Sequence, residues 1–225
     1  MQARILTLSA AMAVSMMSVP ASAVLLNTSF ENGAGTDADN FNEIEASGDT
    51  ANTNPQADRV NSDARTGSFS LRLSYANTAT VGVGSNAEIQ QLTSPPGLVN
   101  PGDTFNFSFF AKRAGDLGPG TVGFYRVQFL DSDGSAGGGV KGDTGLQQYQ
   151  NGLQDGTYTQ FTLNNIIAPA GADAALISIQ LSGGAVANAS ATVFIDDVTL
   201  TTVPEPTAAL ALAGVGAMAL RRKRK

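Results

Sequence analysis

Apolar and polar residues alternate along much of the chain, and this pattern predicts β-strands rather than helices. Between 104 and 113, Phe or Ala occupies every second position. The same period of two returns over 177–182, where Ile and Leu alternate with Ser and Gln. Successive strand residues point to opposite faces, so each strand would have one apolar face. The expected strands are 24–30, 68–75, 87–92, 104–113, 122–130, 157–163, 176–182 and 192–201.

Strands with one apolar face each are what two packed sheets require, so the sequence predicts an all-β fold. About eight strands suit a two-sheet antiparallel jelly-roll β-sandwich. The segment 32–61 is rich in small and polar residues, and we expect a long surface loop there with one short strand at 41–44. No internal repeat or change of composition divides the middle of the chain, which predicts one domain over 24–202.

The N-terminal 23 residues have the three parts of a secretory signal peptide. Arg4 supplies the positive charge, and 5–19 forms a mostly apolar run. Pro20 then precedes Ala21 and Ala23, small residues at the spacing that signal peptidase accepts. We therefore expect an N-terminal signal helix that is removed after Ala23. A retained membrane anchor is the alternative, and Pro20 argues against it.

The C-terminal end also falls into three parts. Pro204, Glu205 and Pro206 interrupt any regular helix or central strand, because each proline lacks an N–H donor. An uncharged run over 207–220 and the basic cluster 221–225 follow. A helix over that run would span about 21 Å, against roughly 30 Å for a bilayer core. We expect a short hydrophobic helix that is held transiently, with its basic end toward the cytoplasm.

The order of these parts over 203–225 resembles the PEP-CTERM protein-sorting signal. The resemblance implies an exosortase-type processing enzyme as a partner, in addition to the signal peptidase that acts at the other end. It also implies transient association with the inner membrane of a Gram-negative bacterium, followed by delivery to the cell surface or extracellular matrix. Such proteins often occur in strains that make exopolysaccharide. An ordinary tail-anchor helix is the alternative.

The composition removes several kinds of chemistry. The chain has no Cys and no His, which excludes disulfides, Ser-His-Asp and Cys-His catalysis and most zinc sites. Over 24–220, seven basic residues stand against all 19 acidic ones, a net charge of −12. Such a surface repels phosphate groups, so we expect no nucleic-acid binding, and it is compatible with Ca²⁺. No pair of carboxyl groups lies in a recognisable acid/base context, so we expect no catalytic residues and no enzyme.

Four further segments resemble successive strands of carbohydrate-binding-module-like, or galactose-binding-like, jelly rolls. They are 27–33, 66–73, 101–105 and 194–200. The resemblance implies a structural Ca²⁺ held by the first strand, the last strand and the loop before the second. The implied metal ligands are Glu31, Asp63, Thr66, Asp196 and Asp197. The alternative is that these side chains cap turns and face water.

Sugar binding would need aromatic platforms with hydrogen-bonding groups around them. The candidates on the polar side of the central strands are Asn106, Phe110, Arg126, Gln128 and Gln180, with Tyr149 overhanging them from a Gln-rich loop. The absence of Trp argues against a strong glycan binder, and a solvated sheet face is the alternative. We therefore expect an exported, non-enzymatic surface or extracellular-matrix protein with weak polysaccharide binding. A purely structural surface protein and a polysaccharide-acting hydrolase are the alternatives.

Overall fold

The computed structural model describes residues 25–78, 84–93, 98–131 and 139–204. Both expected terminal helices lie outside these ranges, as do the cleavage residues Ala21 and Ala23 and the motif residues Glu205 and Pro206. Within the described ranges, no helix is long and apolar enough to cross a membrane. The described strands belong to one compact unit that ends at Val203.

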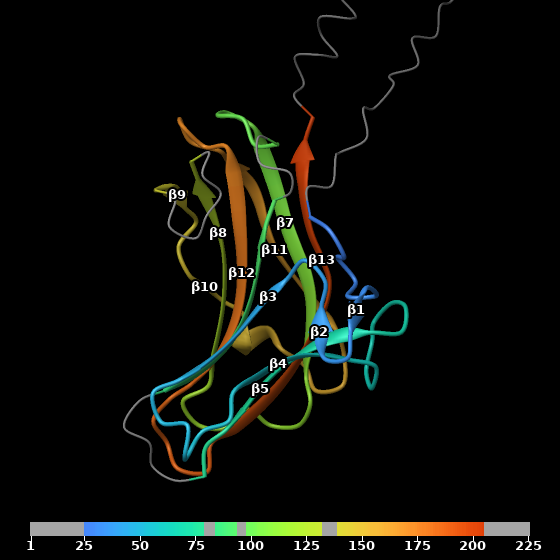
Figure 1. Cartoon of the computed structure of the whole chain (residues 1–225), viewed down its shortest axis with the longest axis vertical. Coiled ribbons are helices and arrows are strands. Elements are labelled where there is room, and N and C mark those ends of the chain that lie inside the picture. Colours follow the sequence, from blue (N-terminus) through green and yellow to red (C-terminus); the bar gives the residue numbers. More distant parts are fainter. Residues whose placement is uncertain (1–24, 79–83, 94–97, 132–138, 205–225) are drawn as a thin grey trace, which may run out of the picture. The chain divides into compact units, whose positions relative to one another are not determined.

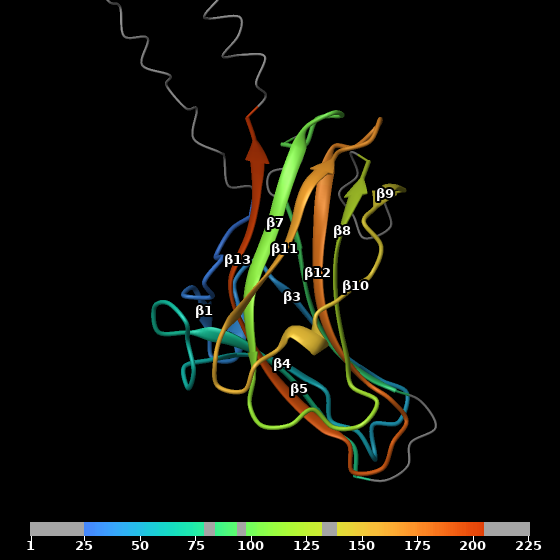
Figure 2. The same cartoon turned by 180° about the vertical axis from the view of Figure 1, so that it is seen from behind.

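Two antiparallel sheets pack against each other and make an all-β sandwich (Figures 1 and 2). The six-stranded sheet has the order β10 (Gln147–Gln148), β8 (Val122–Leu130), β12 (Ala174–Gly183), β6 (Ser85–Leu92) and β3 (Asn42–Ser47), with β9 (Val140–Asp143) also paired to β8. The five-stranded sheet has the order β11 (Thr159–Ile167), β7 (Thr104–Arg113), β13 (Ser190–Val203), β5 (Ser70–Ala76) and β4 (Gln56–Val60). The other described elements are the pair β1 (Gly33–Ala34) and β2 (Asp37–Ala38) and the 3₁₀ turn η1 (Gln150–Gly152).

The core lies between the sheets and follows the predicted alternation. Phe105, Phe107 and Phe109 of β7 are fully buried, and Ile177 and Ile179 of β12 enter the same core from the other sheet. Full burial of one such side chain contributes about 1.5–3 kcal/mol relative to exposure. The strands predicted over 104–113 and 122–130 are confirmed to the residue, because strong alternation leaves only one register that buries the apolar face.

The strand predicted over 24–30 is wrong. Its described residues form turns, in which the N–H of Phe30 donates to the carbonyl oxygen of Asn27 at 3.0 Å. Both residues have left-handed backbones, with φ values of 50° at Asn27 and 58° at Phe30. The turn buries the Phe30 ring, whose centroid lies 4.9 Å from that of Phe41. Tertiary packing therefore overrides the extended conformation that the local pattern favours.

The segment predicted as a loop over 32–61 contains four strands, of which only β3 corresponds to an expected one. The missed strand β4 forms an edge of the five-stranded sheet. Its buried positions are Ala57 and Arg59, so it lacks an apolar face that a pattern could detect. The Arg59 guanidinium lies 3.3 Å from the centre of the Phe69 ring, and its Nε donates to the carbonyl oxygen of Phe30 at 2.6 Å. A paired arginine thus replaces the hydrophobic residue expected there.

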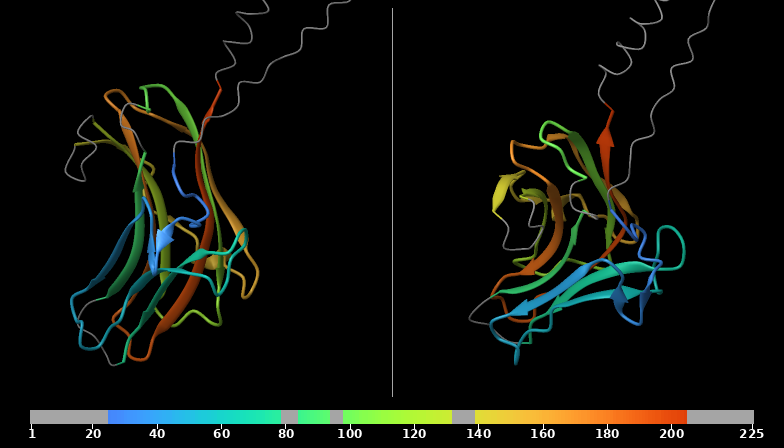
Figure 3. Two further views of the ribbon diagram at one scale, coloured as in Figure 1. Left: turned by 45° about the vertical axis from the view of Figure 1, so that its right-hand side comes forward. Right: turned by 45° about the horizontal axis from the view of Figure 1, so that its top comes forward.

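The last strand, β13, ends at the end of the sandwich where β7 begins and β11 ends. β13 pairs with both β5 and β7 up to a register shift between Asp196 and Thr199, and beyond the shift it continues beside β7. Its final residue Val203 is opposite Thr104, the first residue of β7, and Thr104 is also opposite Ile167, the last residue of β11. The ends of these three strands therefore lie together, as Figure 3 shows.

Candidate functional site

Polar side chains gather on the outer surface of the six-stranded sheet. Inward positions such as Ile89, Tyr125 and Ile179 fill the core, so the alternate positions point outward. The strand register brings outward residues of β6, β8 and β12 into rows across the sheet. We call this surface the polar sheet face; it consists of Asn86, Glu88, Gln90, Phe124, Arg126, Gln128, Ser178, Gln180 and Ser182.

Glu88 is the centre of the polar sheet face. Its Oε1 accepts hydrogen bonds from Ser178 Oγ at 2.6 Å and from Gln90 Nε2 at 2.8 Å. Its Oε2 accepts one from Asn86 Nδ2 at 3.2 Å. Glu88 is only 7% exposed although it points away from the core, because its neighbours cover it. A satisfied network of this kind holds the surrounding amide and hydroxyl groups in fixed positions.

A second set of contacts borders the face on the β9 side. Asp143 Oδ2 accepts a hydrogen bond from Gln128 Nε2 at 3.0 Å and lies 3.4 Å from Arg126 Nη1. The Nε atom of Arg126 is buried and has no hydrogen-bond partner among the described residues. A buried N–H of this kind needs an acceptor from water or a ligand.

Phe124 is the aromatic residue of the face, and it was not among the predicted contact residues. It is half-buried and lies directly opposite Gln180 on one side and Gln148 on the other. Its position could have been found, because within 122–130 it alternates with the inward residues Tyr125 and Val127. An aromatic surface between amide groups offers both apolar contact and hydrogen bonding to a ligand.

Of the six predicted contact residues, three come together here and three, among them Asn106 and Phe110, do not. Arg126, Gln128 and Gln180 all belong to the polar sheet face. Asn106 and Phe110 lie on β7, so the prediction that they share this surface is wrong. The outer faces of two packed sheets point in opposite directions. On that other face, the Phe110 ring lies 3.4 Å from the Arg65 guanidinium.

Tyr149 does not overhang the sheet, and that prediction is also wrong. It is 1% exposed, and its hydroxyl donates to the main-chain carbonyl of Gln180 at 3.1 Å. Its ring packs edge-on to Phe109 at 5.6 Å. β10 and η1 turn the side chain inward over Gly123, where an added Cβ would collide with the ring. Burial raises the pKa of the Tyr149 hydroxyl.

The residues implied for calcium lie around one loop, 61–69, next to β13. Asp196 is fully buried, and its Oδ2 accepts the N–H groups of Arg65 at 2.7 Å and Thr66 at 3.1 Å. Asp197 forms an ion pair with the Arg65 guanidinium and accepts a hydrogen bond from Thr66 Oγ1 at 2.6 Å. Burial raises the pKa of Asp196, and the three N–H donors that it faces act in the opposite direction.

Two further carboxylates hold the same loop. Glu31 Oε1 accepts the N–H groups of Ser68 at 2.9 Å and Phe69 at 3.0 Å. Asp63 Oδ1 lies 2.6 Å from the ammonium group of Lys112, which is 8% exposed. Each carboxylate therefore has N–H or cationic partners within the protein itself.

The arrangement does not fit a calcium ion. Calcium needs six to eight oxygen ligands that are free to turn toward it, whereas the oxygens of Asp196 and Asp197 already face N–H donors and Arg65. Within the described ranges, no group of three acidic, His or Cys residues is placed to hold a metal ion. Calcium binding therefore rests on the resemblance alone, and the described side chains do not support it.

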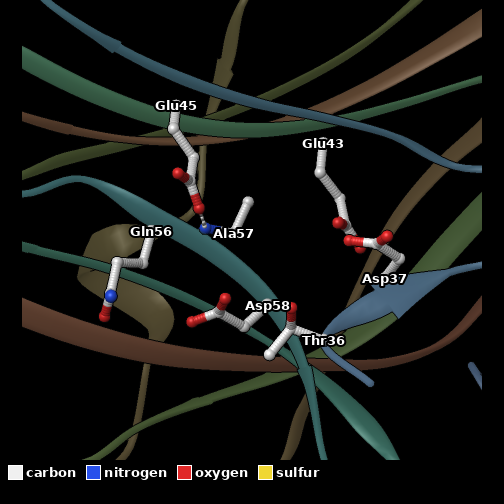
Figure 4. A pocket seen from close by; sticks show the side chains of 7 residues that line it. All are labelled: Thr36, Asp37, Glu43, Glu45, Gln56, Ala57 and Asp58. Carbon is white, nitrogen blue, oxygen red and sulfur yellow. Dashed lines mark hydrogen bonds between the residues drawn. The ribbon is translucent and has the colours of Figure 1, made fainter. Parts of the chain in front are cut away.

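A separate acidic hollow lies where the edges of the two sheets meet (Figure 4). Its volume is about 390 Å³, and four carboxylates line it: Asp37, Glu43, Glu45 and Asp58. Glu43 accepts the N–H of Ala38 and Glu45 that of Ala57, both at 2.9 Å, so the two side chains join β3 to β2 and β4. Burial, and then the nearby acidic groups, raise the pKa of Glu43 to about 7.

Comparison with known proteins identifies a sorting motif at the C-terminal end of the chain. Residues 202–225 match the PEP-CTERM protein-sorting motif. The resemblance found in the sequence is therefore confirmed, and the chain is an exported protein that carries a sorting signal. Of the Pro-Glu-Pro segment, only Pro204 lies within the described residues. No curated protein matches the chain.

Solved structures with a similar fold include carbohydrate-binding modules. One comes from a study of promiscuous specificity in modules of the β-sandwich superfamily, with 16% identity and a TM-score of 0.52 over 77% of this chain. The match spans about 60% of that structure's length. Another is a Stig cyclase from Fischerella sp. TAU, with 16% identity and a TM-score of 0.51 over 82% of this chain and 98% of the cyclase. At such low identity these likenesses show the β-sandwich fold alone.

Proposed function

We propose that this chain is a non-enzymatic surface or extracellular-matrix protein of a Gram-negative bacterium. Its jelly-roll domain would make weak contacts with extracellular polysaccharide through the polar sheet face. A purely structural protein without a small ligand is the competing function, and the experiment below separates the two.

The network around Glu88 is the observation that supports polysaccharide binding. It fixes Asn86, Gln90 and Ser178 on one surface, next to the half-buried ring of Phe124. Hydroxyl-rich chains need such alternating donors and acceptors, together with an apolar surface for the ring face. With one aromatic side chain on the face and no Trp in the sequence, we expect weak affinity.

The sorting signal supports the proposed location. After export and removal of the signal peptide by signal peptidase, the run 207–220 would be held transiently in the inner membrane, with the basic cluster 221–225 behind it. An exosortase-type enzyme would then process the tail and release the domain to the cell surface or matrix.

The carboxylates on and beside the polar sheet face, Glu88 and Asp143, support a binding role rather than a catalytic one. Hydrolysis of a glycosidic bond needs one protonated carboxyl group and a second carboxylate across the bond. Glu88 is held as an acceptor of three side-chain hydrogen bonds, and Asp143 lies beside Arg126 and Gln128. We therefore propose a binding protein, which should release no sugar from the polymers that it binds.

Affinity electrophoresis in gels containing bacterial exopolysaccharide tests the proposed function. We expect the mature protein to be retarded and the double variant Phe124→Ala/Gln180→Ala to migrate freely. Gln160→Ala is the matched control, because Gln160 is exposed on the outer face of the other sheet. Unretarded migration of the wild-type protein across a panel of polysaccharides would instead favour the purely structural function.

A further inference from the structure

Exposed apolar side chains are concentrated at one end of the sandwich. Among the described residues, the large hydrophobic side chains that are exposed are Leu26, Leu98, Val140, Leu146, Ile167 and Val186. Ile167 is 65% exposed and is opposite Thr104, which in turn is opposite Val203. The most exposed of these side chains therefore lies where β13 ends.

Three others lie at the same end. Leu98 belongs to the connection that leads into β7, whose first residue is Thr104. Val140 is opposite Leu130, the last residue of β8. Leu26 bonds through its main chain to the Gln91 side chain, close to the end of β6. β7 begins where β6, β8, β11 and β13 end (Figures 1 and 3), so these four residues belong to one end of the sandwich.

Only three residues, 204–206, separate the last strand from the hydrophobic run of the sorting tail. Val203, still paired with Thr104, is followed at once by Pro204. The hydrophobic run begins at Thr207, and an extended residue advances about 3.3–3.6 Å. The run therefore starts within about 15 Å of the last strand residue. If the run is held in a bilayer, a connection of this length keeps the last strand residue close to the bilayer surface.

We propose that the end of the sandwich surrounded by Leu26, Leu98, Val140 and Ile167, here named the exit end, rests on the lipid surface while the sorting tail is held in the membrane. This inference depends on the transient membrane association in the proposed function. Four of the six large apolar side chains that are exposed among the described residues are then buried in the interface. The polar sheet face extends along the strands and away from that contact, so it stays open to the periplasm.

The charge of the exit end specifies which lipid it fits. Asp103 comes directly before β7 and Asp173 directly before β12, so both carboxylates lie near this end. Lys141 is paired there with Asp131, which leaves the net charge negative. Carboxylates are repelled by anionic headgroups. The contact is therefore apolar, and it should be stronger on zwitterionic vesicles than on anionic ones.

The absence of cysteine allows a direct test with single labels. Ile167→Cys places a fluorophore at the exit end. Val186→Cys is the matched control, because Val186 is 39% exposed and lies between β12 and β13 at the opposite end. The full chain, with its tail, is bound to phosphatidylcholine vesicles that contain lipid with a quencher on the headgroup.

We expect strong quenching at position 167 and little at 186. Equal quenching at both positions, or none at 167 in chains that float with the vesicles, would overturn the inference while leaving membrane association intact. Failure of the chain to float would overturn the membrane association itself. Binding to polysaccharide is measured separately, so neither result depends on the polar sheet face.

A second measurement introduces carboxylates at the exit end and follows retention on the vesicles. Ile167→Asp/Leu98→Asp should lower retention on the vesicles about tenfold, because two apolar side chains no longer enter the interface. Val186→Asp should leave retention unchanged. Equal retention of the double variant and the wild-type chain, at unchanged circular dichroism, contradicts the proposed contact.

Discussion

Arg65 and the acidic residues around it show how single side chains determine the chemistry of a site. The resemblance implied that Thr66, Asp196 and Asp197 share one site, and in the structure the last strand and the 61–69 loop do meet. The resemblance did not indicate that Arg65 would turn its guanidinium toward Asp197 and over the Phe110 ring. Side-chain direction depends on tertiary contacts, here with β7 and β13, that no local pattern contains.

Chelation and one substitution test this arrangement. We expect EGTA to leave the melting temperature of the wild-type protein unchanged, because protein donors satisfy the carboxylates. Arg65→Ala should lower it by about 2–8 °C, since it removes an ion pair and a ring contact together worth about 1–2 kcal/mol. Arg113→Ala is the control, because its partner Asp116 is fully exposed. A melting temperature that falls with EGTA and recovers with Ca²⁺ would mean that the ion binds after all.

At the scale of elements, the strands that could be predicted most closely are those in which apolar and polar residues alternate most strictly. The Phe residues of β7 and the alternating Ile and Leu of β12 indicated these strands directly. The turn at 25–30 was missed because Asn27 and Phe30 adopt left-handed backbones that packing stabilises. β4 was missed because a buried Arg59 occupies a core position, and burial of a charge is visible only when its partners are known.

The edge strands β3 and β4 also give the domain a pH dependence. The folded-state pKa of Glu43 is raised from 4.5 to about 7, so between these values the folded protein holds a proton that the unfolded chain has lost. The free energy of unfolding should therefore fall as pH rises from about 4.5 to about 7, by up to about 3 kcal/mol and less after solvent screening. The groups that face Glu43 are Asp37 of β2, Glu45 of β3 and Asp58 of β4, and Asp58 is paired with Arg72 of β5.

Urea unfolding at several pH values measures this effect. Glu43→Gln keeps an oxygen that can accept the N–H of Ala38, and it should remove most of the slope between pH 5 and pH 7. The variant should then be more stable than the wild-type protein at pH 8. Asp116→Asn, which changes an exposed carboxyl group, should keep the wild-type slope. Parallel slopes for the wild-type protein and Glu43→Gln would rule out Glu43 as the cause.

At the scale of the whole molecule, the two ends and the middle were predictable to different degrees. The sorting motif at 202–225 could be recognised because its parts are contiguous in sequence. The candidate binding surface could be found only in part, because its residues come from β6, β8 and β12 and meet through strand register. Periodicity shows which residues share a strand face, but it does not show which of two sheets a strand joins. Asn106 and Phe110 were misplaced for that reason.

Polysaccharide binding by the polar sheet face is the central proposal for this protein, and an NMR titration tests it most directly. The ¹⁵N-labelled mature protein is titrated with oligosaccharides prepared from a polysaccharide that retards it in the gel. If the polar sheet face binds polysaccharide, amide shift changes should be confined to residues around Glu88 on β6, Phe124 on β8 and Gln180 on β12. Shift changes centred on the outer face of β7 and β11, or no changes at saturating ligand, would contradict this proposal.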